Sequence, residues 1–83
     1  MLQQTATDNI QQFYRQVSHY MQEYDGVFTA CLHFVKKVHE NKTMTRAEII
    51  QLMDTGIYKT PDKVKERVLN EILRTQQSIL VKQ

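Results

Sequence analysis

A threonine–proline pair, Thr60-Pro61, marks the start of a helix with little ambiguity. Proline has no backbone donor to lose at the first helical position and its fixed φ suits a helix, while threonine is a good N-cap before it. A second start lies upstream, because Thr45 and Glu48 have the spacing of a capping box. The two starts are only 15 residues apart, so we expect a short helix between longer ones.

The first half of the chain carries two further helical patterns. One opens at Asp8, at a capping-box position, and keeps apolar side chains on one face as far as Tyr24. Glycine inside a helix costs about 1 kcal/mol relative to alanine, so we expect a break or kink at Gly26. A second helix then runs to Glu40. The alternative is a single bent helix over residues 8–40.

The second half of the chain predicts a short helix and a long one. The short helix covers residues 46–55, and Gly56 is its natural C-terminal stop. The long helix runs over residues 61–80 with apolar side chains along one face. We expect Ile57 and Tyr58, in the link between these two helices, to fold back onto the core.

The composition agrees with an all-α fold. The 83 residues include only two glycines and one proline, which argues against a turn-rich β fold, and 41% are hydrophobic, which is too many for a disordered chain. We expect a flexible tail over residues 1–7 and one domain over residues 8–83, folded as a small antiparallel bundle of three to four helices that forms a dimer. The expected core residues are Ile10, Phe13, Val17, Phe28, Leu32, Val35, Ile49, Leu52, Val68 and Ile72.

Aromatic and apolar residues are concentrated in the first two predicted helices. Six of the seven aromatic residues lie between positions 13 and 34, and the second helix is apolar over more than half of its circumference. A domain of this size buries only roughly 60–65% of its unfolded surface, so association is a common source of extra stability. We therefore predict a homodimer through these helices, with Tyr14, Tyr20, Tyr24 and Phe34 at the interface. The alternative is a monomer in which Tyr20 is merely exposed.

The residues that could carry chemistry are scattered. Cys31 and His33 are two residues apart, which places them about 200° apart on a helix, so they cannot bind one metal ion together. No cationic neighbour or helix N-terminus activates the Cys31 thiol, and the chain has no glycine-rich phosphate loop. We therefore expect no catalytic residues, no bound metal and no cofactor.

The location of the protein is suggested by its cysteine count and its hydropathy. A single cysteine excludes an intramolecular disulfide, which favours the cytoplasm. The N-terminus has neither the basic region nor the apolar run of a signal peptide, and no apolar stretch approaches the roughly 20 residues that span a bilayer. We expect a soluble cytoplasmic protein with no membrane partner.

Charge is distributed unevenly along the chain. Residues 1–25 hold one basic and three acidic residues, whereas residues 59–83 hold six basic and three acidic ones. On the last predicted helix Lys63, Arg67 and Arg74 share one face, which is typical of a stripe that contacts phosphates. Direct nucleic-acid binding is therefore an alternative function, although an ordinary solvated helix face explains the same residues.

The order of these segments resembles the small AriR-type proteins, which are biofilm and acid-resistance regulators or two-component connectors. The resemblance covers residues 13–75 and rests on apolar spacings and segment lengths. The segments that carry it are Phe13-Tyr14, Glu23-Tyr24-Asp25, the apolar helix from Val27 to Val38, Asn41-Lys42-Thr43, Ile49-Ile50-Gln51-Leu52, and a last helix that Thr60 opens and that contains Val64, Val68, Leu69, Ile72, Leu73 and Arg74. The resemblance implies a helical homodimer that adjusts gene expression by binding another regulator, with DNA as a further candidate ligand, and it supplies no catalytic residues.

Together these features predict a small cytoplasmic regulator that acts by protein–protein contact as a helical homodimer in bacterial stress or biofilm responses. Two alternatives stay open. One is a DNA-binding modulator that uses the stripe of Lys63, Arg67 and Arg74. The other is a secretion chaperone, or a phage- or plasmid-encoded inhibitor, that sequesters a partner helix in the groove of a helical dimer.

Overall fold

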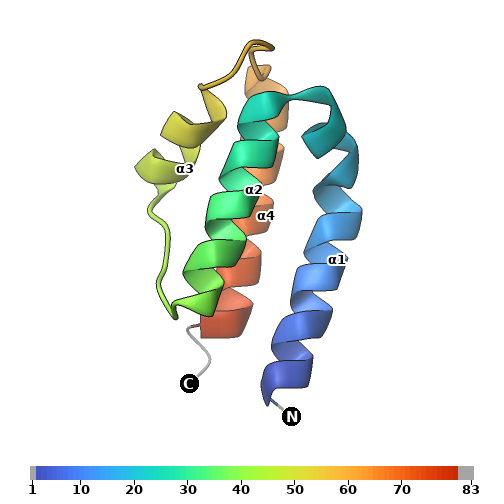
Figure 1. Cartoon of the computed structure of the whole chain (residues 1–83), viewed down its shortest axis with the longest axis vertical. Helices are drawn as coiled ribbons and strands as arrows, with labels where there is room; N and C mark the ends of the chain where they lie inside the picture. Colours follow the sequence, from blue (N-terminus) through green and yellow to red (C-terminus); the bar gives the residue numbers. More distant parts are fainter. Residues whose placement is uncertain (1, 81–83) are drawn as a thin grey trace.

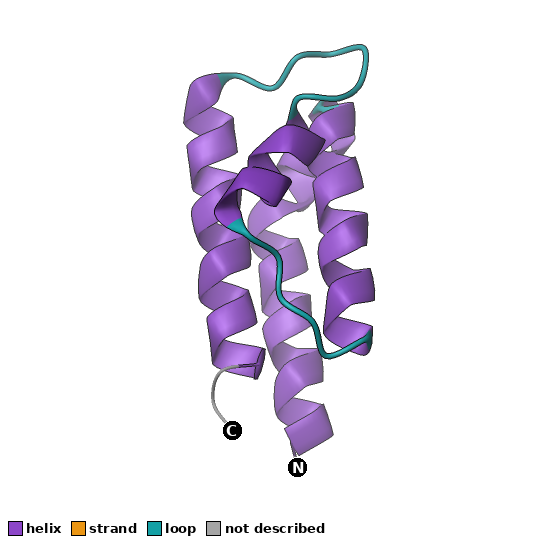
Figure 2. Ribbon diagram, turned by 90° about the vertical axis from the view of Figure 1, so that its left-hand side faces the viewer, coloured by secondary structure: helices purple, strands orange, loops and turns teal. Residues whose placement is uncertain are grey.

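The computed structural model describes the backbone of residues 2–80 and the side chains of residues 8–79. Four helices run in alternating directions: α1 (Leu2–Glu23), α2 (Asp25–His39), α3 (Arg46–Met53) and α4 (Asp62–Leu80) (Figure 1). Residues 2–80 contain no strand, so the predicted all-α antiparallel bundle is confirmed, with four helices. In Figure 2, α2 and α4 lie at opposite edges of the bundle, and α1 and α3 lie on its two flanks.

Helix α1 begins earlier than the sequence predicts. Residues 2–7, expected as a tail, are part of the helix, so the helix start predicted at Asp8 is wrong. This segment lacks apolar periodicity, which is the signal that would have revealed it. At its other end α1 stops at Glu23, because Tyr24 has an extended backbone (φ −129°, ψ 121°). Residues 8–40 therefore belong to two helices rather than to one bent helix.

Gly26 serves the packing of α2 rather than the break between α1 and α2, which falls at Tyr24. It lies in the first turn of α2 and is buried against the end of α3. A Cβ atom at this position would lie 2.7 Å from the carbonyl carbon of Met53 and 2.8 Å from the carbonyl oxygen of Thr55. Both distances are too short for a non-bonded contact of a carbon atom, so only glycine lets the two backbones approach this closely.

Local signals set the boundaries between α2 and α3. The left-handed Asn41 (φ 57°) ends α2 in a Schellman motif, in which the Lys42 amide donates to the Lys37 carbonyl at 2.8 Å. The predicted capping box then opens α3. The Glu48 amide donates to Thr45 Oγ1 at 3.1 Å, and the Thr45 amide donates to the Glu48 carboxylate at 3.4 Å. The predicted start of this helix is therefore confirmed.

A buried glutamine of α4 holds the connection between α2 and α3. Gln76 Oε1 accepts the Met44 amide at 2.7 Å, and Gln76 Nε2 donates to the Met44 carbonyl at 2.9 Å. The Met44 side chain is itself part of the core. The two bonds satisfy both backbone groups of a buried linker residue, which explains why a polar side chain lies inside the bundle.

Helix α4 begins at Asp62, one residue later than the Thr60-Pro61 pair predicts. The Pro61 carbonyl accepts the Lys65 amide at 2.9 Å, so Pro61 occupies the N-cap position. Thr60 is not the cap, because its side chain is buried and its hydroxyl donates to the Met53 carbonyl at 3.1 Å. This bond ties the last turn of α3 to the start of α4.

The core lies between the four helices and contains an edge-to-face pair, Phe13 and Phe34, whose ring centroids are 5.0 Å apart at an interplanar angle of 66°. The predicted core residues that prove to be fully buried are Phe13, Val17, Ile49, Val68 and Ile72. Those that are half-buried are Ile10, Val35 and Leu52. Phe28 and Leu32 are exposed, so their assignment to the core is wrong.

Candidate interaction surface

Two exposed apolar side chains on α2 form one candidate interaction surface of the described chain. Phe28 is 46% exposed and Leu32 is 52% exposed, and they lie one helical turn apart. The buried residues of α2 lie on another face of the helix and are Gly26, Val27, Ala30, Cys31 and Phe34. Helix α2 is therefore apolar on two faces, and the core of the bundle covers one of them.

The position of α2 in the bundle explains this exposure. Helix α4 lies behind α2, and α1 and α3 flank it, so none of the described helices covers its outer face (Figures 1 and 2). The sequence could not separate the two faces, because apolar residues occupy more than half of the helix circumference. Which half becomes core depends on where the other helices pack.

The aromatic residues predicted at a dimer interface fall into two groups. Phe34 is fully buried, so it is a core residue and the interface prediction is wrong for it. Tyr14, Tyr20 and Tyr24 are half-buried and pack against the core. Burial raises the pKa of Tyr14, and the nearby Cys31 thiol adds to the rise. Part of each tyrosine remains free to contact another molecule.

The loop between α3 and α4 presents a second apolar pair. Ile57 is 87% exposed and Tyr58 is 64% exposed, so the prediction that they fold back onto the core is wrong. The loop is anchored at its base, where the Ile57 amide donates to Asp25 Oδ2 at 3.4 Å. Next to it, Gly56 adopts a left-handed backbone (φ 109°) beside the Asp25 side chain. These contacts hold the backbone of the loop and leave both apolar side chains in solvent.

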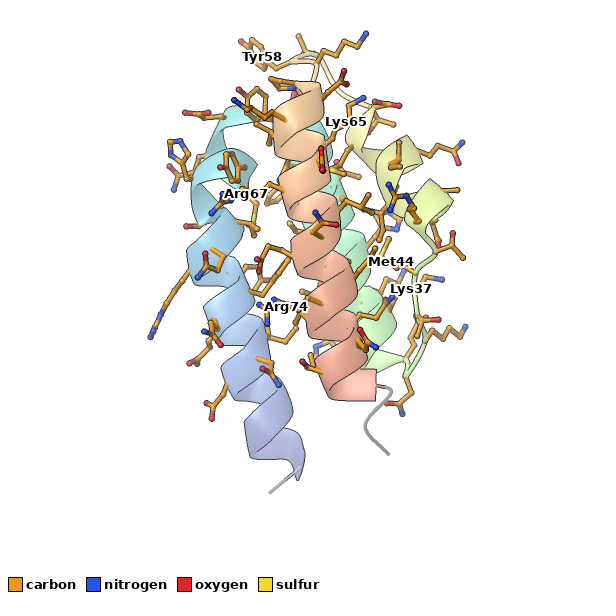
Figure 3. All side chains as sticks on the ribbon, turned by 180° about the vertical axis from the view of Figure 1, so that it is seen from behind. Lys37, Met44, Tyr58, Lys65, Arg67 and Arg74 are labelled. Atoms are coloured by element: carbon orange, nitrogen blue, oxygen red, sulfur yellow. The ribbon has the colours of Figure 1, made fainter. Side chains whose placement is uncertain are left out.

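The basic residues predicted on one face of the last helix lie on the surface of α4. Lys63, Arg67 and Arg74 are all exposed. Figure 3 shows Arg67 and Arg74 on the side of α4 toward α1, with Tyr58 above them at the end of the bundle. Arg74 lies 3.0 Å from the Glu71 carboxylate, whereas Lys63 and Arg67 form no ion pair with any described side chain.

Lys65 lies on the other side of α4 and joins this helix to α3 (Figure 3). Its ammonium group is 2.5 Å from the Asp54 carboxylate and 3.7 Å from the Asp62 carboxylate. The hydrogen bond to Asp54 and the charges of both carboxylates raise the pKa of Lys65. Lys65 therefore contributes to the fold and is not part of the exposed basic stripe.

Chemically reactive groups are sparse in the described part of the chain. No group of three His, Cys, Asp or Glu side chains within it lies close enough together to hold a metal ion. Cys31 is buried, and burial raises the pKa of its thiol to about 12, which keeps the thiol protonated near neutral pH. None of the described helices is long and apolar enough to cross a membrane.

Comparison of the chain with protein-family models, with curated proteins and with solved structures finds no match. The resemblance to the AriR-type proteins therefore stays a prediction from apolar spacing. The surfaces of the described chain that are available to a partner include the outer face of α2, the loop between α3 and α4, and the basic stripe of α4.

Proposed function

We propose that this protein is a small, non-enzymatic cytoplasmic regulator that acts by protein–protein contact as a homodimer. The observation that supports the proposal is the pair Phe28 and Leu32, two large apolar side chains that are about half exposed on α2. Single exposed apolar residues are normal on a protein surface, but adjacent ones on neighbouring turns of one helix form a patch.

The exposed area of this pair sets the expected strength of the dimer. Complete burial of a phenylalanine or leucine side chain is worth about 1.5–3 kcal/mol, so covering the exposed half gives roughly 1 kcal/mol for each. A two-fold interface covers four such side chains and gains about 4 kcal/mol. This gain matches only the lower end of the cost of association, about 4–15 kcal/mol, so neighbouring contacts must contribute. We expect a reversible dimer that depends on concentration.

Sedimentation equilibrium tests the dimer. Leu32→Glu places a charge in the apolar patch and should keep the protein monomeric at concentrations where the wild type dimerises. His33→Glu is the matched control, because His33 is exposed on another face of the same helix and the introduced charge is identical. An unchanged association constant for Leu32→Glu, or a wild type that stays monomeric throughout, would contradict the proposal.

A regulatory role also requires a second partner, and the loop between α3 and α4 is its candidate contact. Tyrosine is enriched at the energetically important positions of interfaces, and Tyr58 is exposed beside Ile57. Affinity capture from the native host should enrich a response regulator or a transcription factor, and Tyr58→Ala should reduce its recovery without changing the dimer. Recovery of an apolar secretion substrate instead would contradict the regulatory role and favour the chaperone alternative.

A second candidate function is nucleic-acid binding along α4. Lys63 and Arg67 are exposed and form no ion pair with a described side chain, and the exposed ring of Tyr58 lies at the same end of the bundle. Cations of this kind contact phosphates, and an exposed aromatic ring can stack on a base. Fluorescence anisotropy with a labelled oligonucleotide should then show binding that weakens with added salt and with Arg67→Gln. Arg15→Gln, at an exposed position of α1, is the control, and equal losses in both variants would remove this candidate.

A further inference from the structure

The outer face of α2 has the spacing of a helix-pairing seam. Asp25, Phe28, Leu32, Val35 and His39 follow one another at intervals of three and four residues, which is the a and d pattern of a heptad. Val35 is half-buried, and the other four side chains are exposed. These five residues, the outer seam, are distinct from the buried residues of α2. The helix therefore has one face for its own bundle and a second that points outward.

Four of the five outer-seam residues are exposed, and the loop between α3 and α4 contacts the seam at Asp25, where the Ile57 amide donates to Asp25 Oδ2. Helix α2 lies at one edge of the bundle in Figure 2, with α1 and α3 set back on its flanks. Its 15 residues span about 22 Å at 1.5 Å per residue, so a second helix could contact the seam over four turns.

The charges of α2 favour antiparallel pairing with a copy of itself. The first turn carries Asp25, and the last turn carries Lys36, Lys37 and His39. Lys37 points toward α3, where its ammonium group lies 4.0 Å from the Glu48 carboxylate, whereas Lys36 is exposed. A parallel pair would place two acidic turns together and align two helix dipoles. An antiparallel pair instead places the acidic turn of each helix beside the basic turn of the other.

We propose that a second copy of this chain covers the outer seam, with the two α2 helices packed antiparallel. The inference rests on the proposed homodimer and specifies its geometry. Phe28 of each copy packs against Leu32 of the partner subunit, about a two-fold axis level with residue 30, so the two most exposed apolar side chains of α2 bury each other. In this register Asp25 lies near Lys36 of the partner subunit.

Disulfide trapping distinguishes this geometry from other dimers. A disulfide requires Cα atoms about 4.4–6.8 Å apart, so it forms only between positions that lie opposite each other. Mild oxidation of a mixture of Phe28→Cys and Leu32→Cys proteins should give the mixed dimer in preference to either dimer of one variant. Both positions are exposed, so the variants should fold normally, and the buried Cys31 should not compete.

His39→Cys is the matched control for direction. In the antiparallel register the two copies of position 39 lie about 27 Å apart along the helix axes and form no disulfide, whereas in a parallel pair they lie side by side. A disulfide-linked dimer of His39→Cys protein would therefore overturn the antiparallel geometry. A dimer in solution that none of these cysteines traps would overturn the choice of face and leave the homodimer standing. A monomer at every concentration would overturn both.

Discussion

Gln76→Met removes two buried hydrogen bonds while it keeps a side chain of similar length. In the wild type Gln76 Oε1 accepts the Met44 amide at 2.7 Å, and Gln76 Nε2 donates to the Met44 carbonyl at 2.9 Å. Both residues are buried, so the amide and the carbonyl of Met44 would lose their partners without gaining water. We expect a large loss of stability from this single change.

The magnitude follows from the two backbone groups left unpaired. Each buried group without a partner costs about 1–3 kcal/mol, and the more apolar methionine offsets part of the sum, so we expect a loss of about 2–4 kcal/mol. A chain of 83 residues has a total stability of about 4–12 kcal/mol, so this loss is a large fraction of it. In a domain of this size each 1 kcal/mol lowers the Tm by about 4–8 °C, which predicts a Tm roughly 8–32 °C lower.

Urea and thermal unfolding followed by circular dichroism measure the change. Gln77→Met is the matched control, because Gln77 is the exposed neighbour in α4 and its replacement should change the free energy of unfolding by less than about 0.5 kcal/mol. Equal stability of the two variants would show that the Met44 backbone groups do not depend on Gln76. Gln76→Glu adds a pH test: a carboxylate cannot donate to the Met44 carbonyl but a protonated carboxyl can, so its deficit should shrink as the pH falls.

Three other buried positions give specific predictions. Cys31 should react with a thiol reagent only after unfolding, because it is buried and its pKa is raised to about 12; rapid labelling of the native protein at neutral pH would contradict this. Thr75→Val should raise the free energy of unfolding by about 1 kcal/mol, since the buried Thr75 hydroxyl has no hydrogen-bond partner in the described chain, whereas Thr75→Ser should not. Gly26→Ala should lower the free energy of unfolding by about 1–3 kcal/mol despite the helix preference of alanine, because its Cβ would meet the Met53 carbonyl; a more stable variant in urea unfolding would disprove that close approach.

The boundaries of the helices were largely predictable, because they depend on residues a few positions apart. Thr45 and Glu48 form the predicted capping box through two local hydrogen bonds. The break near Gly26 was also anticipated, and it falls at Tyr24. The start of α1 at Leu2 was missed, since a polar segment that extends an existing helix needs no apolar pattern of its own.

Features that join distant parts of the chain were not predictable. Gln76 binds Met44 across 32 positions, and no periodicity in the sequence links the two. The exposure of Phe28 and Leu32 was not predictable for the same reason. The packing of α1, α3 and α4, which are distant in sequence, decides which apolar face of α2 is covered. The sequence therefore indicated an excess of apolar surface on α2. The residue of this helix predicted at the interface was Phe34, however, and the bundle buries it.

Whether a second copy covers the outer seam of α2 can be measured most directly by NMR spectra recorded over a dilution series. A homodimer through this face predicts chemical shifts that change with concentration at Phe28, Leu32 and Val35, and constant shifts at Arg67 on the opposite edge of the bundle. Spectra that do not change with concentration, or changes at Arg67 without changes at Leu32, would contradict it.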